Sequence, residues 1–190
     1  MDANRGVPAN ACLAGRISAP APLRLNANLS LRELRQPALV ADLARTLAET
    51  GLAPDDLTLE ITESMAISDP EGTIDVLRRL KALGVRLAVD DFGTGYASLT
   101  VLKRFPVDEI KIDRSFVAGL GHNQEDAAIV RATVGVAKAL GLGVTAEGVE
   151  TAEQLVLLGE LGCDLGQGYF FAPALAADDL TAGLNTGVFP

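Results

Sequence analysis

The amino-acid sequence predicts an α/β protein with a mainly parallel sheet. Short apolar runs alternate with longer amphipathic stretches, and this alternation of strand and helix repeats about six times. Parallel strands need crossover connections, which the amphipathic stretches can supply as helices. Of the 190 residues, 48% are hydrophobic and 22% are charged, a balance typical of a globular domain with a sizeable core. An open doubly wound sheet and a (β/α) barrel both fit this pattern.

The expected strands are the short apolar runs, and the expected helices are the amphipathic stretches between them. Strands are predicted at residues 23–29, 57–62, 86–91, 109–113, 143–149 and 166–172. Helices are predicted at residues 37–50, 70–83, 97–105, 125–140, 151–161 and 178–185. Residues 1–22 are rich in Ala, Pro, Gly and Asn without a sustained period. We expect them to be a leader with little structure, followed by a barrel domain at 23–190.

Capping residues at the helix boundaries support this assignment. Ser30 with Glu33, and Thr151 with Gln154, fit the capping box, in which two side chains satisfy free backbone amides at a helix start. Gly51 lies where a helix should end, as a left-handed cap. No GxGxxG or Walker sequence opens any of the helices, so a nucleotide-binding Rossmann or P-loop fold is weakly supported.

Charge and cysteine content argue against several classes of protein. The formal net charge of −9 disfavours a general DNA- or RNA-binding surface, and an anionic ligand would need metal ions, lysines or backbone amides. Two cysteines without a CxxC pattern predict neither a disulfide framework nor a zinc site, and we expect a reducing, cytoplasmic location. Arg131 and Lys138 interrupt the longest apolar stretch, so no membrane span is expected.

Polar residues at the strand ends carry the functional prediction. Successive strands finish in an amide, an acid or a lysine, and the residues are Asn28, Glu60, Glu63, Asp90, Asp91, Lys111, Asp113, Glu147, Glu150 and Gln167. In a barrel the carboxyl ends of the strands meet at one mouth, where active sites lie. Each residue alone also fits a solvated acid, a helix cap or a rim ion pair. The joint pattern is what indicates a site.

The oxygen atoms in this set suit a magnesium or manganese ion. Asn28, Glu60, Asp90 and Asp91 offer only oxygen ligands, which Mg²⁺ and Mn²⁺ accept and zinc sites seldom use alone. Because Asp90 and Asp91 are adjacent, one should point into the barrel and the other away or along its rim. The two could then reach different positions around one site, such as two metal ions. The FGTG sequence that follows lets the backbone turn sharply and approach a ligand.

Several segments resemble the EAL domain, the bacterial cyclic-di-GMP phosphodiesterase family. In the family's order and with its spacing, they are NANLS, LTLEITES, AVDDFGTGYASL, VDEIKIDRSFV, TAEGVET and GCDLGQGYFFAP. They cover roughly residues 23–175. The resemblance implies a TIM-like (β/α)8 barrel with one antiparallel strand. It also implies two Mg²⁺ or Mn²⁺ ions and in-line attack of water that opens cyclic-di-GMP to linear pGpG.

The resemblance implies a role for each residue of the set. Metal ligands would be Asn28, Glu60 and Asp90 for one ion, with Asp90 and Asp91 for the second. Lys111 would hold or polarise the attacking water, and Glu147 would be the general base. The remaining residues would steady the loop after the paired aspartates, or complete the metal shell and the substrate contacts: Glu63, Asp113, Glu150 and Gln167. The family further implies a homodimer, with sensor or GGDEF domains in a longer parent protein.

The Glu-Ala-Leu motif that gives the family its name is missing from the sequence. In the family its glutamate lies on the first barrel strand and binds metal, but here no glutamate precedes Glu33. We therefore expect an N-terminally truncated, incomplete barrel without its first strand and helix, and a phosphodiesterase impaired by the lost ligand. The alternative is a catalytically inactive module that binds cyclic-di-GMP or a protein partner. A fragment that does not fold stably alone is a third hypothesis.

Overall fold

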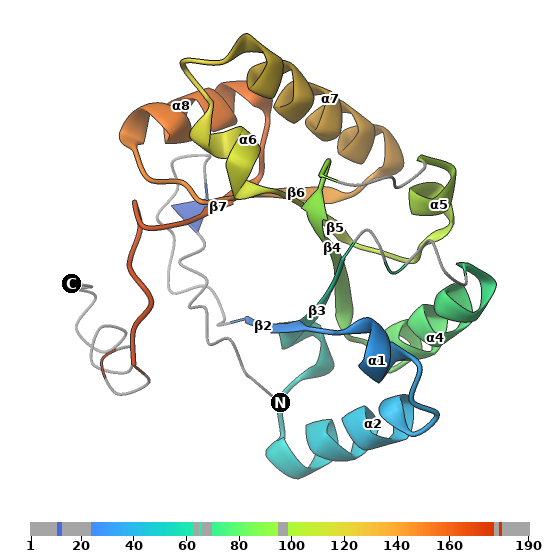
Figure 1. Cartoon of the computed structure of the whole chain (residues 1–190). Coiled ribbons are helices and arrows are strands. Elements are labelled where there is room, and N and C mark those ends of the chain that lie inside the picture. Colours follow the sequence, from blue (N-terminus) through green and yellow to red (C-terminus); the bar gives the residue numbers. More distant parts are fainter. Residues whose placement is uncertain are drawn as a thin grey trace.

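Seven strands form one sheet in the computed structural model, which describes residues 11–12, 24–62, 65, 70–94, 99–176 and 179. The strands are β1 (Ala11–Cys12), β2 (Leu25–Asn28), β3 (Leu57–Thr62), β4 (Arg86–Phe92), β5 (Glu109–Ile112), β6 (Gly143–Glu147) and β7 (Leu165–Gln167). Their order is β1-β7-β6-β5-β4-β3-β2. Strands β2 to β7 pair in parallel with their sequence neighbours, whereas β1 pairs antiparallel with β7. Figure 1 shows the strands following one another around a curved sheet.

Helices connect the parallel strands and cover the outer, convex side of the sheet (Figure 1). In the described part of the chain they are α1 (Leu31–Leu34), α2 (Leu39–Thr50), α4 (Pro70–Ala82), α5 (Leu99–Arg104), α6 (Arg114–Ala118), α7 (Gln124–Leu140) and α8 (Ala152–Leu161), with a 3-10 turn η1 (Pro54–Asp56). Helices α2, α4, α5, α7 and α8 lie where the sequence predicts helices. The helix predicted at 178–185 lies outside the described residues except for position 179. None of the helices described is long and apolar enough to cross a membrane.

Both predicted capping boxes are present. At α1, the backbone amide of Glu33 donates to Ser30 Oγ at 3.3 Å, and the amide of Ser30 donates to Glu33 Oε2 at 2.9 Å. At α8, the amide of Gln154 donates to Thr151 Oγ1 at 3.2 Å, and the amide of Thr151 donates to Gln154 Oε1 at 3.1 Å. Gly51 ends α2 in the left-handed conformation, with φ of 68°. The local sequence therefore sets these helix boundaries.

The two faces of the sheet differ in polarity. Along the central strands apolar and polar residues alternate, and successive side chains of a strand point to opposite faces. The residues facing the helices are buried in the core: Leu57, Leu59, Ile61, Leu87, Val89, Ile110, Ile112, Val144 and Ala146. The residues that alternate with them are mostly polar: Thr58, Glu60, Arg86, Asp90, Glu109, Lys111, Thr145 and Glu147. The hydrophobic core thus lies between sheet and helices, and the polar side chains collect on the concave face.

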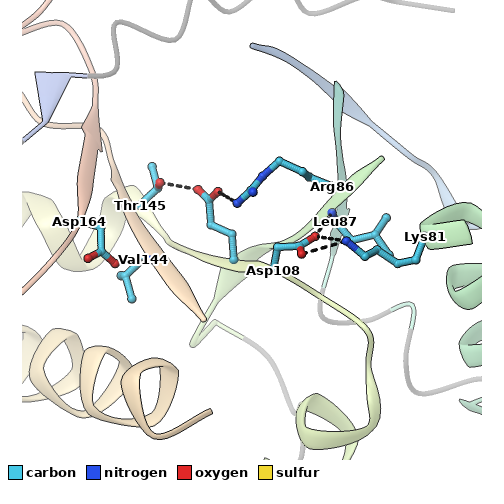
Figure 2. Close-up of polar contacts among 8 residues, drawn as sticks. Lys81, Arg86, Leu87, Asp108, Val144, Thr145 and Asp164 are labelled. Atoms are coloured by element: carbon cyan, nitrogen blue, oxygen red, sulfur yellow. Dashed lines mark hydrogen bonds and ion pairs between the residues drawn. The ribbon is translucent and has the colours of Figure 1, made fainter. Parts of the chain in front are cut away.

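Aspartates tie neighbouring strands together at their amino-terminal ends (Figure 2). Asp108 comes directly before β5, and its Oδ2 accepts a 2.8 Å hydrogen bond from the amide of Leu87 on β4. The same carboxylate lies 2.9 Å from the ammonium of Lys81, at the end of α4. Asp164 comes directly before β7 and accepts a 2.9 Å hydrogen bond from the amide of Val144 on β6. These contacts fix the strand register at the amino-terminal ends of the strands.

Strand β1 lies inside residues 1–22, the stretch expected to have little structure. Its two residues pair with Gly166 and Leu165 of β7, so this strand is an exception to that expectation. Its direction agrees with the single antiparallel strand that the resemblance implies. Strands β1 and β2 are the two ends of the strand order, so the described residues form an open, partial barrel.

Candidate active site

Lys111 lies at the centre of a cluster of acids on the concave face. Its Nζ is 2.6 Å from Glu60 Oε1 and 3.7 Å from Asp90 Oδ1, and it also forms an ion pair with Glu147. Lys111 is only 3% exposed and Glu60 is 6% exposed. Lys111 is on β5 and Glu60 is on β3, with β4 between them. The contact therefore crosses the inside of the curve, and acids from three strands share one buried ammonium.

Burial and charge act against each other in this cluster. Burial raises the pKa of Glu60 and the pKa of Glu147, although the Lys111 ammonium opposes the effect. Burial also disfavours the charged form of Lys111, but Glu147, Glu60 and Asp90 outweigh it and raise the pKa of this lysine above its ordinary value. Lys111 is therefore protonated at neutral pH. One positive charge faces three acids, so the cluster retains negative charge that favours a cation.

A β-bulge in β4 places the paired aspartates opposite the same lysine. The pairing of β4 with β5 shifts by one residue between Val89 and Phe92. Asp90 and Asp91 therefore oppose the single residue Lys111. Asp91 has φ of 54°, a left-handed conformation that aspartate tolerates better than most residues. The bulge interrupts the simple alternation of β4, so both residues can contribute to one site, with Asp90 half-buried and Asp91 exposed.

Asp90, Asp91 and Glu147 form a candidate site for a divalent cation. One carboxylate oxygen of each residue lies within 4.8 Å of the others. Burial, and then the neighbouring charges of Asp90 and Asp113, raise the pKa of Asp91. Crowding of this kind is relieved when a cation or a proton comes between the carboxylates. An oxygen-only set fits Mg²⁺ or Mn²⁺.

Asn28 and Gln167 end the outermost parallel strands at the level of the cluster. Asn28 of β2 is the register partner of Glu60 on β3. Gln167 of β7 is the register partner of Glu147 on β6. The sheet therefore places both amides beside acids that contact Lys111.

The remaining predicted residues lie at the beginnings of helices or outside the described residues. Asp113 follows β5 and caps α6, a helix that the sequence analysis missed, by accepting a 2.9 Å hydrogen bond from the amide of Ser115. Burial opposes ionisation of Asp113, but the hydrogen bonds from Ser115 outweigh it and lower the pKa of Asp113. The Asp91 carboxyl, in its protonated form, can donate a hydrogen bond to Asp113, which adds to the lowering of the pKa of Asp113 and to the raising of the pKa of Asp91. Glu150 is exposed just before α8, and Glu63 lies outside the described residues.

Polar residues below the strand ends were missed by the sequence analysis. Asn26 hydrogen-bonds the Glu60 side chain from β2. Thr145 Oγ1 donates a hydrogen bond to Glu109 Oε1 across β6 and β5. The signal that could have found Asn26, Glu109 and Thr145 is their position two residues before a predicted site residue, since residues two apart share a strand face.

Comparison with known proteins identifies the family, since a model of the EAL domain matches residues 10–174. The chain belongs to the EAL domain family. It is 48% identical to an uncharacterised signalling protein of Caulobacter vibrioides over 166 residues, which are 87% of this chain and 20% of that protein. This EAL domain chain thus spans about a fifth of the length of that relative.

Solved structures of the EAL family share the fold. MucR of Pseudomonas aeruginosa, described as a phosphodiesterase in complex with c-di-GMP, is 42% identical with a TM-score of 0.79, over 83% of this chain and 64% of that one. BlrP1 of Klebsiella pneumoniae, in a manganese and cyclic-di-GMP complex, is 38% identical with a TM-score of 0.73, over 78% of this chain and 38% of that one. These matches confirm the resemblance and the barrel fold class.

Proposed function

We propose that this EAL domain is a phosphodiesterase that hydrolyses cyclic-di-GMP to linear pGpG with two Mg²⁺ or Mn²⁺ ions. The observation that carries the proposal is the buried ammonium of Lys111 among Glu60, Asp90 and Glu147. The description of MucR as a phosphodiesterase complexed with c-di-GMP supports the substrate. The manganese complex of BlrP1 supports the choice of cation.

The acids of the cluster fit divalent cations. Asp90, Asp91 and Glu147 bring carboxylate oxygens close together, and Asp90 is the residue that would serve both ions. Asn28 and Glu60, side by side on β2 and β3, would complete the ligands of one ion. Bound cations would supply Lewis-acid activation of the phosphate and lower the pKa of an attacking water. They would also offset the charge of −9, which by itself repels an anionic substrate.

Lys111 and Glu147 are suited to handle the water. The Lys111 ammonium stays protonated, so it can donate a hydrogen bond that holds the water oxygen in line with the phosphorus. Glu147 has a raised pKa and a partly exposed carboxylate, 21% accessible, so it can accept the proton of that water. The water oxygen then bonds to phosphorus as one bridging P–O bond breaks. The released ribose oxygen takes up a proton from solvent to become a hydroxyl, so the ring opens and linear pGpG is left.

A second candidate function is binding of cyclic-di-GMP, or of a protein partner, without hydrolysis. The observation that favours it is that the Lys111 ammonium already pairs with Glu60 and Glu147, two acids of the proposed site. An ammonium that holds these acids competes with a cation for them. Such a module would use the same residues to hold the dinucleotide.

The proposal extends to partners and location. We propose a homodimer in the cytoplasm, within a longer parent that carries sensor or GGDEF domains. The name of MucR, a bifunctional diguanylate cyclase and cyclic di-GMP phosphodiesterase, supports a second catalytic region in such a parent. The net charge supports the absence of a DNA or RNA ligand.

The deciding experiment is hydrolysis of cyclic-di-GMP by the purified chain with Mg²⁺ or Mn²⁺, and with EDTA as control. Chromatography should show pGpG that depends on the metal. A folded, monodisperse sample that binds the dinucleotide but forms no product would support the second candidate instead. A sample with neither binding nor turnover would overturn both.

A further inference from the structure

A second polar layer lies on the concave face beneath the Lys111 cluster. Thr145 Oγ1 donates a hydrogen bond to Glu109 Oε1, and Arg86 Nη2 lies 4.0 Å from Glu109 Oε2 (Figure 2). Thr145 is only 4% exposed, and the Glu109 side chain is 14% exposed. One carboxylate on β5 is therefore approached from β6 on one side and from β4 on the other.

The hydrogen bond of Thr145 is stronger than the contact of Arg86. A separation of 4.0 Å is the outer limit of an ion pair, and the Arg86 side chain is 30% exposed. Its buried Nε also has no hydrogen-bond partner within the described residues. By contrast, a hydroxyl that donates to a buried carboxylate makes a short, charge-assisted bond. Thr145 therefore determines where the carboxylate of Glu109 lies.

The pair Glu109–Thr145 repeats the geometry of the pair Lys111–Glu147. Glu109 precedes Lys111 by two residues and Thr145 precedes Glu147 by two, so all four side chains share one face. Each pair joins a β5 residue to the β6 residue 36 positions later, as 145 − 109 and 147 − 111 both give. The two pairs are neighbours along β5 and β6 and run diagonally in the same direction. The Glu109–Thr145 pair lies one pleat below the Lys111–Glu147 pair.

The relative position of β5 and β6 matters because Lys111 contacts acids on both sides of β5. Its ammonium contacts Glu60 of β3 and Glu147 of β6, so a small slide of β5 against β6 would favour one acid over the other. Lys111 is itself the register partner of Thr145. The Glu109–Thr145 hydrogen bond therefore joins β5 to β6 beside the backbone of Lys111.

We propose that Thr145 and Glu109 are positioning residues that hold the Lys111–Glu147 pair in its reactive geometry. The kinetic consequence rests on the proposed phosphodiesterase function. Misplacement of a catalytic group by about 1 Å can cost about 100-fold in rate. Loss of the Glu109–Thr145 hydrogen bond should move the Lys111–Glu147 pair by less than this distance, and lower kcat about 5- to 20-fold. KM should change less than about twofold, because neither residue is among the groups expected to touch substrate or metal.

Thr145→Val tests the proposal, since valine matches threonine in shape but lacks the hydroxyl. Thr145→Ser, which keeps the hydroxyl, should recover most of the lost kcat. Thr133→Val is the matched control, because Thr133 is a buried threonine on α7, outside the sheet. Equal kcat values for all four proteins, or the same loss in Thr145→Ser as in Thr145→Val, would overturn the proposal.

A second readout keeps the positioning inference separate from the proposed function. NMR of the ¹³Cε and ¹⁵Nζ signals of Lys111 in the metal-free protein reports where its ammonium lies, whether or not the protein turns over substrate. Thr145→Val should shift these signals, while Thr145→Ser and Thr133→Val should leave them near their wild-type positions. Unshifted Lys111 signals in Thr145→Val would contradict the inference. If the wild type is inactive but Thr145→Val shows the expected shifts, the phosphodiesterase proposal is wrong and the positioning role of Thr145 and Glu109 stands.

Discussion

Asp108 and Asp164 fasten the sheet in the same way at two places. Each residue directly precedes a strand and accepts a hydrogen bond from the second residue of the neighbouring strand, Leu87 for Asp108 and Val144 for Asp164. Each carboxylate also pairs with a lysine in the last turn of the helix that leads into that neighbouring strand, Lys138 for Asp164 and Lys81 for Asp108. Figure 2 shows the pair of Lys81 with Asp108. The same combination of hydrogen bond and ion pair thus joins β4 to β5 and β6 to β7.

The two arrangements also have the same spacing, in residues, to the candidate site. Three residues after each amide donor comes an acid of the cluster, Asp90 on β4 and Glu147 on β6. Three residues after each aspartate comes a polar strand-end residue, Lys111 on β5 and Gln167 on β7. A fixed register at the amino-terminal ends of the strands therefore sets which polar groups meet at their carboxyl ends.

Replacement of Asp108 by Ala should reduce stability more than loss of its lysine partner. The Asp108 carboxylate is 27% exposed, and its removal leaves the amide of Leu87 without its acceptor. We expect a loss of about 2 kcal/mol in the free energy of unfolding. Lys81→Met removes only a partly exposed ion pair and should cost less than about 1 kcal/mol. Urea denaturation measures both values, and equal losses would show that the backbone hydrogen bond contributes little.

Asp91→Asn and Asp91→Ala should separate charge from backbone conformation. Asn tolerates the φ of 54° and removes one charge from the crowded acids, so this variant should match or slightly exceed the wild type in stability without metal. Solvent screening keeps any gain below about 1 kcal/mol. Ala removes the same charge but is strained at positive φ, and should be about 1 kcal/mol less stable than Asn. Thermal melts in EDTA compare the pair, and an Ala variant as stable as Asn would argue against the left-handed conformation.

The stability of the metal-free protein should fall as pH rises from about 5 toward neutrality. The pKa values of Glu60 and Glu147 are raised above the ordinary 4.5, so the native state binds more protons than the unfolded chain in this range. Lys111 contributes no slope there, because its stabilisation is present below its ordinary pKa of 10.5 and is lost only at more alkaline pH. Urea denaturation at several pH values should show this slope, and Glu147→Gln should flatten it. A rising free energy of unfolding would mean that Lys111 outweighs burial at these acids.

Divalent cations should stabilise the chain through the oxygens of the proposed ligands, Asp90 and Asp91 among them. Ligand that binds only the native state adds about 2.7 kcal/mol at 100 times its Kd, so Mg²⁺ or Mn²⁺ should raise Tm. Asp90→Asn should lose most of this rise and most hydrolytic activity while keeping the fold. Asp75→Asn, on the exposed side of α4, is the control and should behave as the wild type. Full metal stabilisation in Asp90→Asn would remove Asp90 from the ligand set.

Lys111→Ala should slow turnover more than it weakens metal binding. The variant removes the ammonium proposed to hold the attacking water, while the acids that would bind metal remain. Loss of one partner from a buried ion pair costs about 3–5 kcal/mol, and bound cations should recover part of this loss. Calorimetric titration gives the metal Kd and steady-state kinetics give kcat. Weak metal binding with near-normal kcat would assign Lys111 to the metal site instead of to the water.

Local sequence signals predicted most of the elements. The strands and the five longer helices follow from apolar periodicity, and the caps at Ser30 and Thr151 set where two helices begin. Helix α6 was missed because its five residues are too short for a periodic pattern, although Asp113 is a good N-cap. Strand β1 was missed because its two residues are held only by pairing with β7, which no local pattern reveals.

The sequence by itself determined the succession of strands and helices and the chemical groups of the candidate site, because acids, amides and one lysine stand at successive strand ends. Only the tertiary structure decided which groups meet. Lys111 reaches Glu60 across β4 because the sheet curves, and Asp90 and Asp91 both lie opposite Lys111 in the strand register because of a bulge in β4. Curvature and bulges arise from pairing between distant segments, and their geometry depends on contacts that no short stretch of sequence contains.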